Sequence, residues 1–89
     1  MRAVITVIGK DRTGIIYHVS NILFHADINI LDISQTIMQD MFTMIMLVDI
    51  SKTTLSFESI GKNLEDKGKE LGLSIHIQHE DIFNSMHKI

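Results

Sequence analysis

The 89-residue chain has no cysteine and no proline, and only 6% of its residues are aromatic. Without cysteine there can be no disulfide and no thiolate chemistry. No apolar run approaches the roughly 18 residues that a membrane span needs, and no signal peptide precedes the first predicted strand, so we expect a cytoplasmic protein. The formal net charge is −3 with no basic run, which argues against direct binding to nucleic acid.

The composition that remains is that of one small globular domain, residues 1–89. Hydrophobic residues make up 45% of the chain and charged residues 21%, which is ordinary for such a domain. A domain of this size buries only about 60% of the surface that its unfolded chain exposes. We therefore expect a marginal core, to which self-association would add stability.

Apolar periodicity predicts the order of the elements. Segments that are apolar on both faces are typical of central strands, and segments that alternate apolar and polar residues are typical of edge strands. The central strands are residues 2–8 and 42–50, and the edge strands are residues 28–38 and 73–78. Apolar stripes at helical spacing run through residues 15–26, 57–71 and, as a tail, 80–89.

Turn and cap residues between these segments predict how the segments are connected. Gln39-Asp40-Met41 is short enough to make a hairpin of the second and third strands, although the usual Asn-Gly signal is missing. Ser51 to Thr54 offers helix-cap candidates, and Gly72 is placed to end the second helix. The order β-α-β-β-α-β with right-handed crossovers predicts an α+β, ferredoxin-like sheet of order 4-1-3-2 with two helices on one face. The other face needs cover, either from the tail helix or from a second subunit.

The loop after the first strand, in the stretch TVIGKDRTGIIYHV, is the candidate binding site. Gly9 and Gly14 have the spacing of a phosphate loop, but Ile15 and Ile16 stand where it requires Lys and Ser/Thr, so nucleotide binding is excluded. Free N–H groups at a helix start, with the positive end of the helix dipole, suit a carboxylate, and Asp11 suits an ammonium group. The alternative is a loop that binds nothing, in which Gly9 ends the strand and Asp11 caps the helix. On residue types alone this alternative is the commoner arrangement.

The run from Ile5 to Gln35 resembles the start of an ACT domain. Asp11-Arg12-Thr13-Gly14 matches the D/N-R-x-G loop of that family, and Asn29-Ile30 matches the head of its second strand. More narrowly, the chain is similar to the small stand-alone ACT proteins of the UPF0237 group. It is also similar to modules of the glycine cleavage system transcriptional repressor, which share the ITVIGKDRxGI opening and DISQT.

The resemblance implies a regulatory module that binds an amino acid, or a similar small metabolite, between two copies in a homodimer. It implies an allosteric effect on a protein partner, and neither a cofactor nor catalysis. The ligand contacts that it implies are Gly9, Lys10, Asp11, Arg12, Thr13, Gly14, Asn29 and Ile30. Many amino-acid-binding members have Asn where this chain has Asp11, so ligand identity does not transfer. A frequent proline is replaced by Thr13, which leaves the loop less rigid before binding.

Other residues support weaker hypotheses. The five histidines, His76, His79 and His87 among them, lack the spacing of a metal site, so none is predicted. The methionines are expected to pack rather than to bind a soft metal, and they include Met38, Met41, Met44 and Met46.

Two alternatives to a sensor stay open. One is an acylphosphatase-like hydrolase that uses Arg12, although the Gly-Phe-Arg loop of those enzymes is absent. The other is a dimerisation module with an empty loop. RNA-recognition modules share the order of elements but need aromatic residues on the central strands, where this chain has Val, Ile and Met.

Overall fold

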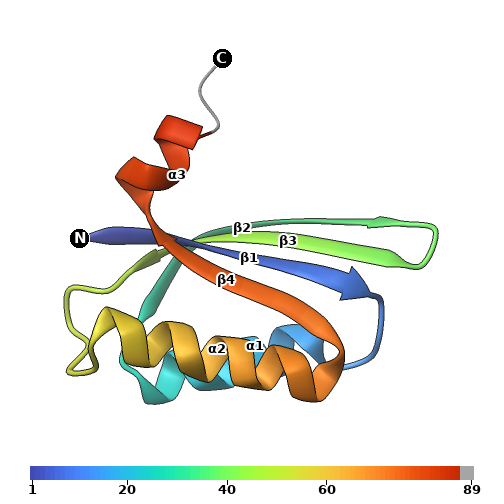
Figure 1. Ribbon diagram of the computed structural model, residues 1–89, viewed down its shortest axis with the longest axis horizontal. Helices are drawn as coiled ribbons and strands as arrows, with labels where there is room; N and C mark the ends of the chain where they lie inside the picture. Colours follow the sequence, from blue (N-terminus) through green and yellow to red (C-terminus); the bar gives the residue numbers. More distant parts are fainter. Residues whose placement is uncertain (87–89) are drawn as a thin grey trace.

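The computed structural model describes residues 1–86, and within them the chain forms four strands and three helices. The strands form one antiparallel sheet of order β2-β3-β1-β4, which confirms the predicted ferredoxin-like topology. Two helices cover one face of the sheet, and the third rises from the opposite face (Figure 1). The elements are β1 (Arg2–Lys10), α1 (Ile15–His25), β2 (Asn29–Met38), β3 (Met41–Asp49), α2 (Phe57–Leu71), β4 (Leu73–His79) and α3 (Glu80–Met86).

The core lies between the two central strands and the layer formed by α1 and α2. On β1, Ala3, Ile5 and Val7 are fully buried, because alternate residues of a strand point to the same face. Met44 and Met46 of β3 are equally buried, which confirms that these methionines pack in the core. The same prediction is wrong for Met38 and Met41, which are exposed at the end of the β2–β3 hairpin.

The helices begin and end close to the predicted positions. The buried residues of α1 are Ile15, Val19 and Leu23, the stripe expected from the sequence. The N-cap of α2 is Ser56, whose hydroxyl accepts a 3.1 Å hydrogen bond from the Ser59 amide. The cap therefore comes after the Ser51 to Thr54 segment rather than from it. Gly72 ends α2 in a left-handed conformation with φ of 74°, as predicted.

The predicted hairpin is present, but its turn contains only Gln39 and Asp40. Met38 and Met41 pair across this turn, so Met41 is the first residue of β3 rather than part of the connection. Gln39 takes the positive φ of 58° that a tight hairpin needs. The turn therefore forms without the usual Asn-Gly pair, because Gln39 itself adopts the left-handed conformation.

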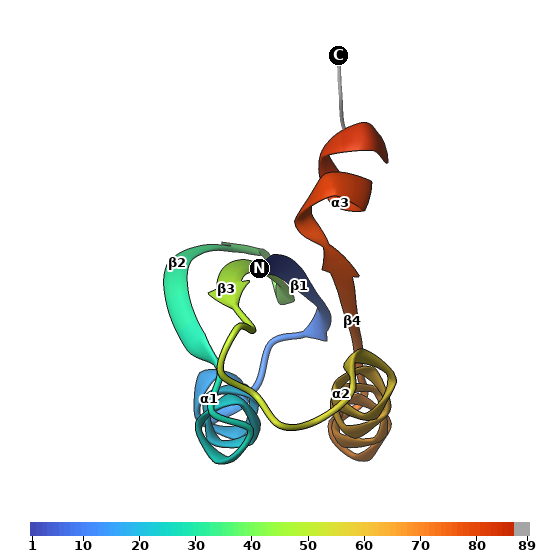
Figure 2. The same cartoon turned by 90° about the vertical axis from the view of Figure 1, so that its left-hand side faces the viewer.

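The tail helix α3 lies on the side of the sheet away from α1 and α2 (Figures 1 and 2). It contacts β1 and β4, and the Arg2 guanidinium donates two hydrogen bonds to the Glu80 carboxylate at its start. The predicted helical tail is thus confirmed as far as Met86, and Ile89 lies outside the described residues. Within residues 1–86, no helix has the length and apolarity to cross a membrane.

Candidate functional site

The loop between β1 and α1 leaves the start of α1 without a side-chain cap. The N-cap is Gly14, with a left-handed φ of 88°, and no side chain within residues 1–86 accepts a hydrogen bond from the first turn as Ser56 does for α2. Asp11 therefore does not cap this helix, contrary to the alternative considered from the sequence. Amide groups at an uncapped helix start are available to an anion, and the helix dipole favours one there.

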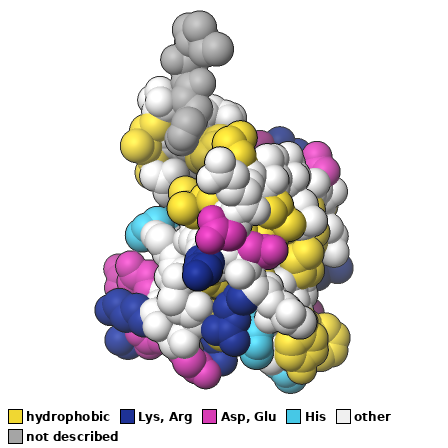
Figure 3. Space-filling view, turned by 90° about the vertical axis from the view of Figure 1, so that its right-hand side faces the viewer, with side chains coloured by type: hydrophobic (Ala, Val, Ile, Leu, Met, Phe, Trp, Pro, Cys, Tyr) yellow, Lys and Arg dark blue, Asp and Glu magenta, His cyan; other side chains and the backbone are white. Residues whose placement is uncertain are grey.

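The loop is tied to the hairpin turn that lies beside it. The Asp11 amide donates a 2.7 Å hydrogen bond to the Asp40 carbonyl oxygen, and this contact joins the two turns at the same end of the sheet. Asp11, Arg12 and Thr13 are all exposed. In the view toward this end of the molecule, acidic and basic side chains lie close together (Figure 3). The loop therefore offers charges of both signs over a backbone held in place by the hairpin.

Gly9 and Lys10 belong to β1 rather than to the loop. Gly9 pairs with Phe42 of β3 and Leu73 of β4, so the strand does not end there. A Cβ atom on Gly9 would lie 2.5 Å from Leu73 Cδ2 and 3.2 Å from the Gly72 carbonyl oxygen. The close approach of β4 therefore accounts for this glycine without a ligand.

Arg12 points toward the end of α2. One of its guanidinium nitrogens donates a long, 3.4 Å hydrogen bond to the Leu71 carbonyl oxygen, at the negative end of that helix. The contact joins the loop to the end of α2. It does not support a role for Arg12 as the phosphate-binding residue of a hydrolase.

His18 is a residue of this site that the sequence reasoning missed. A Cβ atom on Gly14 would lie 3.7 Å from His18 Cδ2 and 3.8 Å from His18 Nε2, so the half-buried imidazole borders the uncapped helix start. Its ring also makes an edge contact with Tyr17 at a centroid distance of 5.4 Å. The available signal was its spacing of four residues from Gly14, one helical turn.

Asn29 lies at the opposite end of the sheet from the loop. It pairs with Asp49 of β3, which pairs with Arg2 at the start of β1, whereas Lys10 at the end of β1 pairs with Met41. Eight residues of strand separate these two positions on β1, or about 26 Å. Within one chain, therefore, the loop and Asn29 do not meet.

The surroundings of Asn29 are polar and partly hollow. This exposed residue borders a cavity of about 430 Å³, whereas Ile30 is half-buried and packs against the core. The other residues that line the cavity are Phe24, Asp27, Ile28, Asp49 and Lys52.

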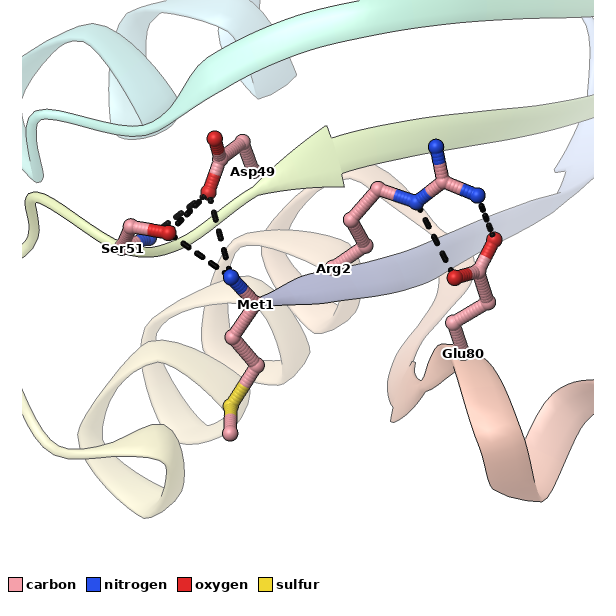
Figure 4. Close-up of polar contacts among 5 residues, drawn as sticks. All are labelled: Met1, Arg2, Asp49, Ser51 and Glu80. Atoms are coloured by element: carbon pink, nitrogen blue, oxygen red, sulfur yellow. Dashed lines mark hydrogen bonds and ion pairs between the residues drawn. The ribbon is translucent and has the colours of Figure 1, made fainter.

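At the edge of this cavity, hydrogen bonds from Ser51 hold Asp49 in its charged form (Figure 4). The Ser51 hydroxyl and the Ser51 amide both donate to the Asp49 carboxylate, and these bonds lower the pKa of Asp49 below its usual value. The α-amino group of Met1 lies 3.7 Å from the same carboxylate and donates to the Ser51 hydroxyl. Asp49 is thus an anion at the Asn29 end of the sheet.

The four histidines within residues 1–86 do not gather into a metal site. No group of three or more His, Cys, Asp or Glu residues within residues 1–86 is arranged to hold a metal ion, and His87 lies outside the described residues. His76 is within 2.9 Å of the Ser74 hydroxyl, and the His79 ring stacks on Phe57 at a centroid distance of 4.0 Å.

Comparison with known proteins agrees with this fold. The profile of the ACT domain family matches residues 2–78. The UPF0237 protein of Clostridium acetobutylicum is 61% identical over 89 residues, covering all of both chains. The ACT domain protein from Streptococcus pneumoniae superimposes with a TM-score of 0.81 at 40% identity, covering 93% of each chain. A chain described as a glycine cleavage system transcriptional repressor superimposes with a TM-score of 0.75 at 27% identity, over 86% of this chain and 44% of that one.

The chain belongs to the ACT domain family, and within it to the UPF0237 group. The family is one of small-molecule-binding regulatory modules, so this chain is a regulatory module of that general kind.

Proposed function

We propose that the protein is a cytoplasmic sensor of an amino acid or a similar small metabolite, bound between two copies of the chain, and that ligand occupancy regulates a protein partner. The observation that carries the proposal is the uncapped N-terminus of α1 at Gly14. The ligand carboxylate binds the free amide groups there, next to His18, while Asp11 accepts from the ligand ammonium group.

Each binding site combines the loop of one copy with Asn29 of the other. Two copies that pair their β2 edges in antiparallel fashion about a two-fold axis have opposite strand directions. The start of β2 in one copy, with Asn29, then lies at the end of the sheet where the partner carries Asp11 to Gly14. Within a single chain the loop and Asn29 lie at opposite ends of the sheet, and this separation supports the arrangement.

The β2 side of the molecule has the properties of a self-association surface. β2 is an edge strand, so its outer N–H and C=O groups have no strand partner within residues 1–86. Ile33 and Ile37 are exposed along it. On the neighbouring helix α1, Ile16 and Phe24 are exposed two turns apart, and Phe24 is 76% exposed beside Asn29. We call the exposed strip of β2 and α1 the β2 edge.

Regulation requires that the ligand bind two states of the dimer with different affinity. A coupling free energy of about 1–3 kcal/mol, or about 5- to 150-fold in affinity, is typical of such systems. In this proposal the ligand joins the α1 start of one copy to the β2 start of the other. Ligand occupancy therefore changes how tightly and in what orientation the two copies pair. The regulated protein, which is a different chain, recognises that pairing.

A thermal-shift screen of the protein against the amino acids tests this function. A ligand at 100 times its Kd stabilises the folded state by about 2.7 kcal/mol. Each kcal/mol raises the Tm of a domain this size by about 4–8 °C, so the correct ligand should give a shift of about 10–20 °C.

Matched variants locate the binding. Asp11→Ala and Asn29→Ala should lose the shift, whereas Asn63→Ala, an exposed amide on α2, should keep it. A screen with no shift from any amino acid favours a dimerisation module with an empty loop. Turnover of an acyl phosphate that is lost in Arg12→Ala favours the hydrolase.

A further inference from the structure

The face of the sheet opposite α1 and α2 carries no charged side chain on β1, β3 and β4 between the Val4 and Ile8 rows. On the edge strand β2, the register places Asp32 beside Leu47 on the same face. Directly paired residues share a face, so each row of partners can be read from the register. We call this set the open face: Val4, Thr6, Ile8, Thr43, Ile45, Leu47, Ser74, His76 and Gln78. Ile8 and Ile45 are both exposed on it, and exposed apolar side chains that lie together favour an interaction surface.

The helix α3 covers only one end of the open face. Val4, at that end, is 5% exposed, whereas Ile45 is 39% and Ile8 is 44% exposed toward the other end. α3 does not fold down along the strands but rises from the sheet (Figures 1 and 2). The Arg2–Glu80 ion pair and a 3.4 Å hydrogen bond from the Gln78 amide to Met86 Sδ hold it at this end.

The raised helix exposes apolar side chains of its own. Ile82 is 51% and Met86 67% exposed, on a helix that stands beside the open face. Its seven residues span about 10 Å, which equals the spacing of about 10 Å between two sheets packed face to face.

We propose that the open face docks a second copy of this chain, sheet against sheet, with the two α3 helices closing the two ends of the interface. A two-fold axis between the sheets, perpendicular to the strands, places the partner's α3 at the Ile8 end of this copy. Each α3 then covers the end of the open face that the partner's own α3 leaves bare.

The area available shows what this occupant must cover. Seven paired residues of β1 are about 23 Å long, and the three strands of the open face are about 14 Å wide. Two such faces give about 650 Å² of sheet contact, below the roughly 1,000 Å² that a specific interface needs. The two α3 helices supply the remaining contact, so the sheet alone is insufficient and the raised helix is part of the interface.

This surface is separate from the β2 edge and goes beyond the proposed function. A chain that uses both surfaces assembles as a tetramer with two kinds of two-fold interface. The two interfaces can be broken independently, because Ile45 lies on the central strand β3 and Ile37 on the edge strand β2.

Molar mass in solution, from light scattering or sedimentation equilibrium at several protein concentrations, tests the proposal. Ile45→Glu should halve the mass of the wild-type assembly, and Ile8→Glu should do the same from the other end of the face. Leu55→Glu is the matched control, since Leu55 is 40% exposed but precedes α2 on the helix side. A mass that stays at the wild-type value in both Ile45→Glu and Ile8→Glu overturns the proposal.

The same experiment separates the two interfaces. If the β2-edge dimer is wrong but the open face docks, the wild type is a dimer and Ile45→Glu a monomer. If the open face is wrong but the edge pairs, Ile45→Glu keeps the wild-type mass and Ile37→Glu lowers it.

A disulfide gives a second readout that does not depend on breaking the interface. The chain has no native cysteine, so Ile8→Cys combined with Ile82→Cys can form only bridges that involve the new thiols. Within one copy, Ile8 is about 13 Å along β1 from the α3 end, too far for a bridge, which needs Cα atoms within about 7 Å. A covalent dimer on a non-reducing gel, absent from either single variant, supports the proposal, and its absence under oxidation counts against it.

Discussion

Replacing Gly14 by alanine should destabilise the protein through the backbone alone. Gly14 has a φ of 88°, and the left-handed region costs an L-residue with a Cβ about 1–2 kcal/mol. The new methyl group meets no clash, because its nearest neighbour is His18 Cδ2 at 3.7 Å. The expected loss of unfolding free energy is therefore about 1–2 kcal/mol, with no contribution from packing.

The same substitution at Gly61 should have the opposite sign. Gly61 lies inside α2 without a positive φ, and a Cβ there would make an ordinary 3.5 Å contact with Ile77 Cγ2. Alanine inside a helix is about 0.5–1 kcal/mol more favourable than glycine. The two variants should thus lie on either side of the wild type, separated by about 1.5–3 kcal/mol.

Urea unfolding of the three proteins measures this difference. All are compared at one protein concentration, since self-association adds to apparent stability. Gly14→Asn should fall between wild type and Gly14→Ala, because asparagine tolerates the left-handed region. If Gly14→Ala is as stable as the wild type, α1 does not begin at a left-handed glycine and the description of the site is wrong.

Three further predictions test the capping, the core and the α3 anchor. Ser56→Ala should cost about 1 kcal/mol in urea unfolding, because the first turn of α2 loses its cap; no loss would contradict that cap. Leu64→Ala should cost about 2–5 kcal/mol, since Leu64 is fully buried and leaves a cavity; a smaller loss would mean a looser core. The hydrogen bonds from Arg2 keep the pKa of Glu80 below its usual 4.5, so this pair stabilises the fold above that pH and is lost as pH falls through the lowered pKa. Glu80→Gln should therefore lower the Tm at neutral pH and flatten its fall in acid, and identical pH profiles would contradict the ion pair.

The topology could be predicted because the strands differ in composition. β1 and β3 are apolar on both faces and lie at the centre, whereas β2 and β4 mix polar residues into the pattern and lie at the edges. Local signals also located the helix ends, as at Gly72. Strand composition and helix ends depend on residues close together in the sequence, so they can be predicted from the sequence alone.

Long-range placement could not be predicted in the same way. The sequence offered Asp11 and Asn29 as members of one site, but strand direction and register separate them within the chain. Gly9 looked like a strand end, and only the approach of Leu73 from β4 explains why it continues the strand. The orientation of α3 depends on the Arg2–Glu80 pair, 78 residues apart, and no local pattern encodes it.

The central claim is that one binding site takes its loop from one copy and Asn29 from the other. The most direct test mixes two inactive variants, Asp11→Ala and Asn29→Ala, after unfolding and refolding them together, and counts ligand sites by calorimetry with the amino acid that raises the Tm most. In a mixed dimer one site carries both substitutions and the other carries neither, so random pairing should restore about a quarter of the wild-type sites. If the mixture binds no more than either variant alone, the site is not shared between copies.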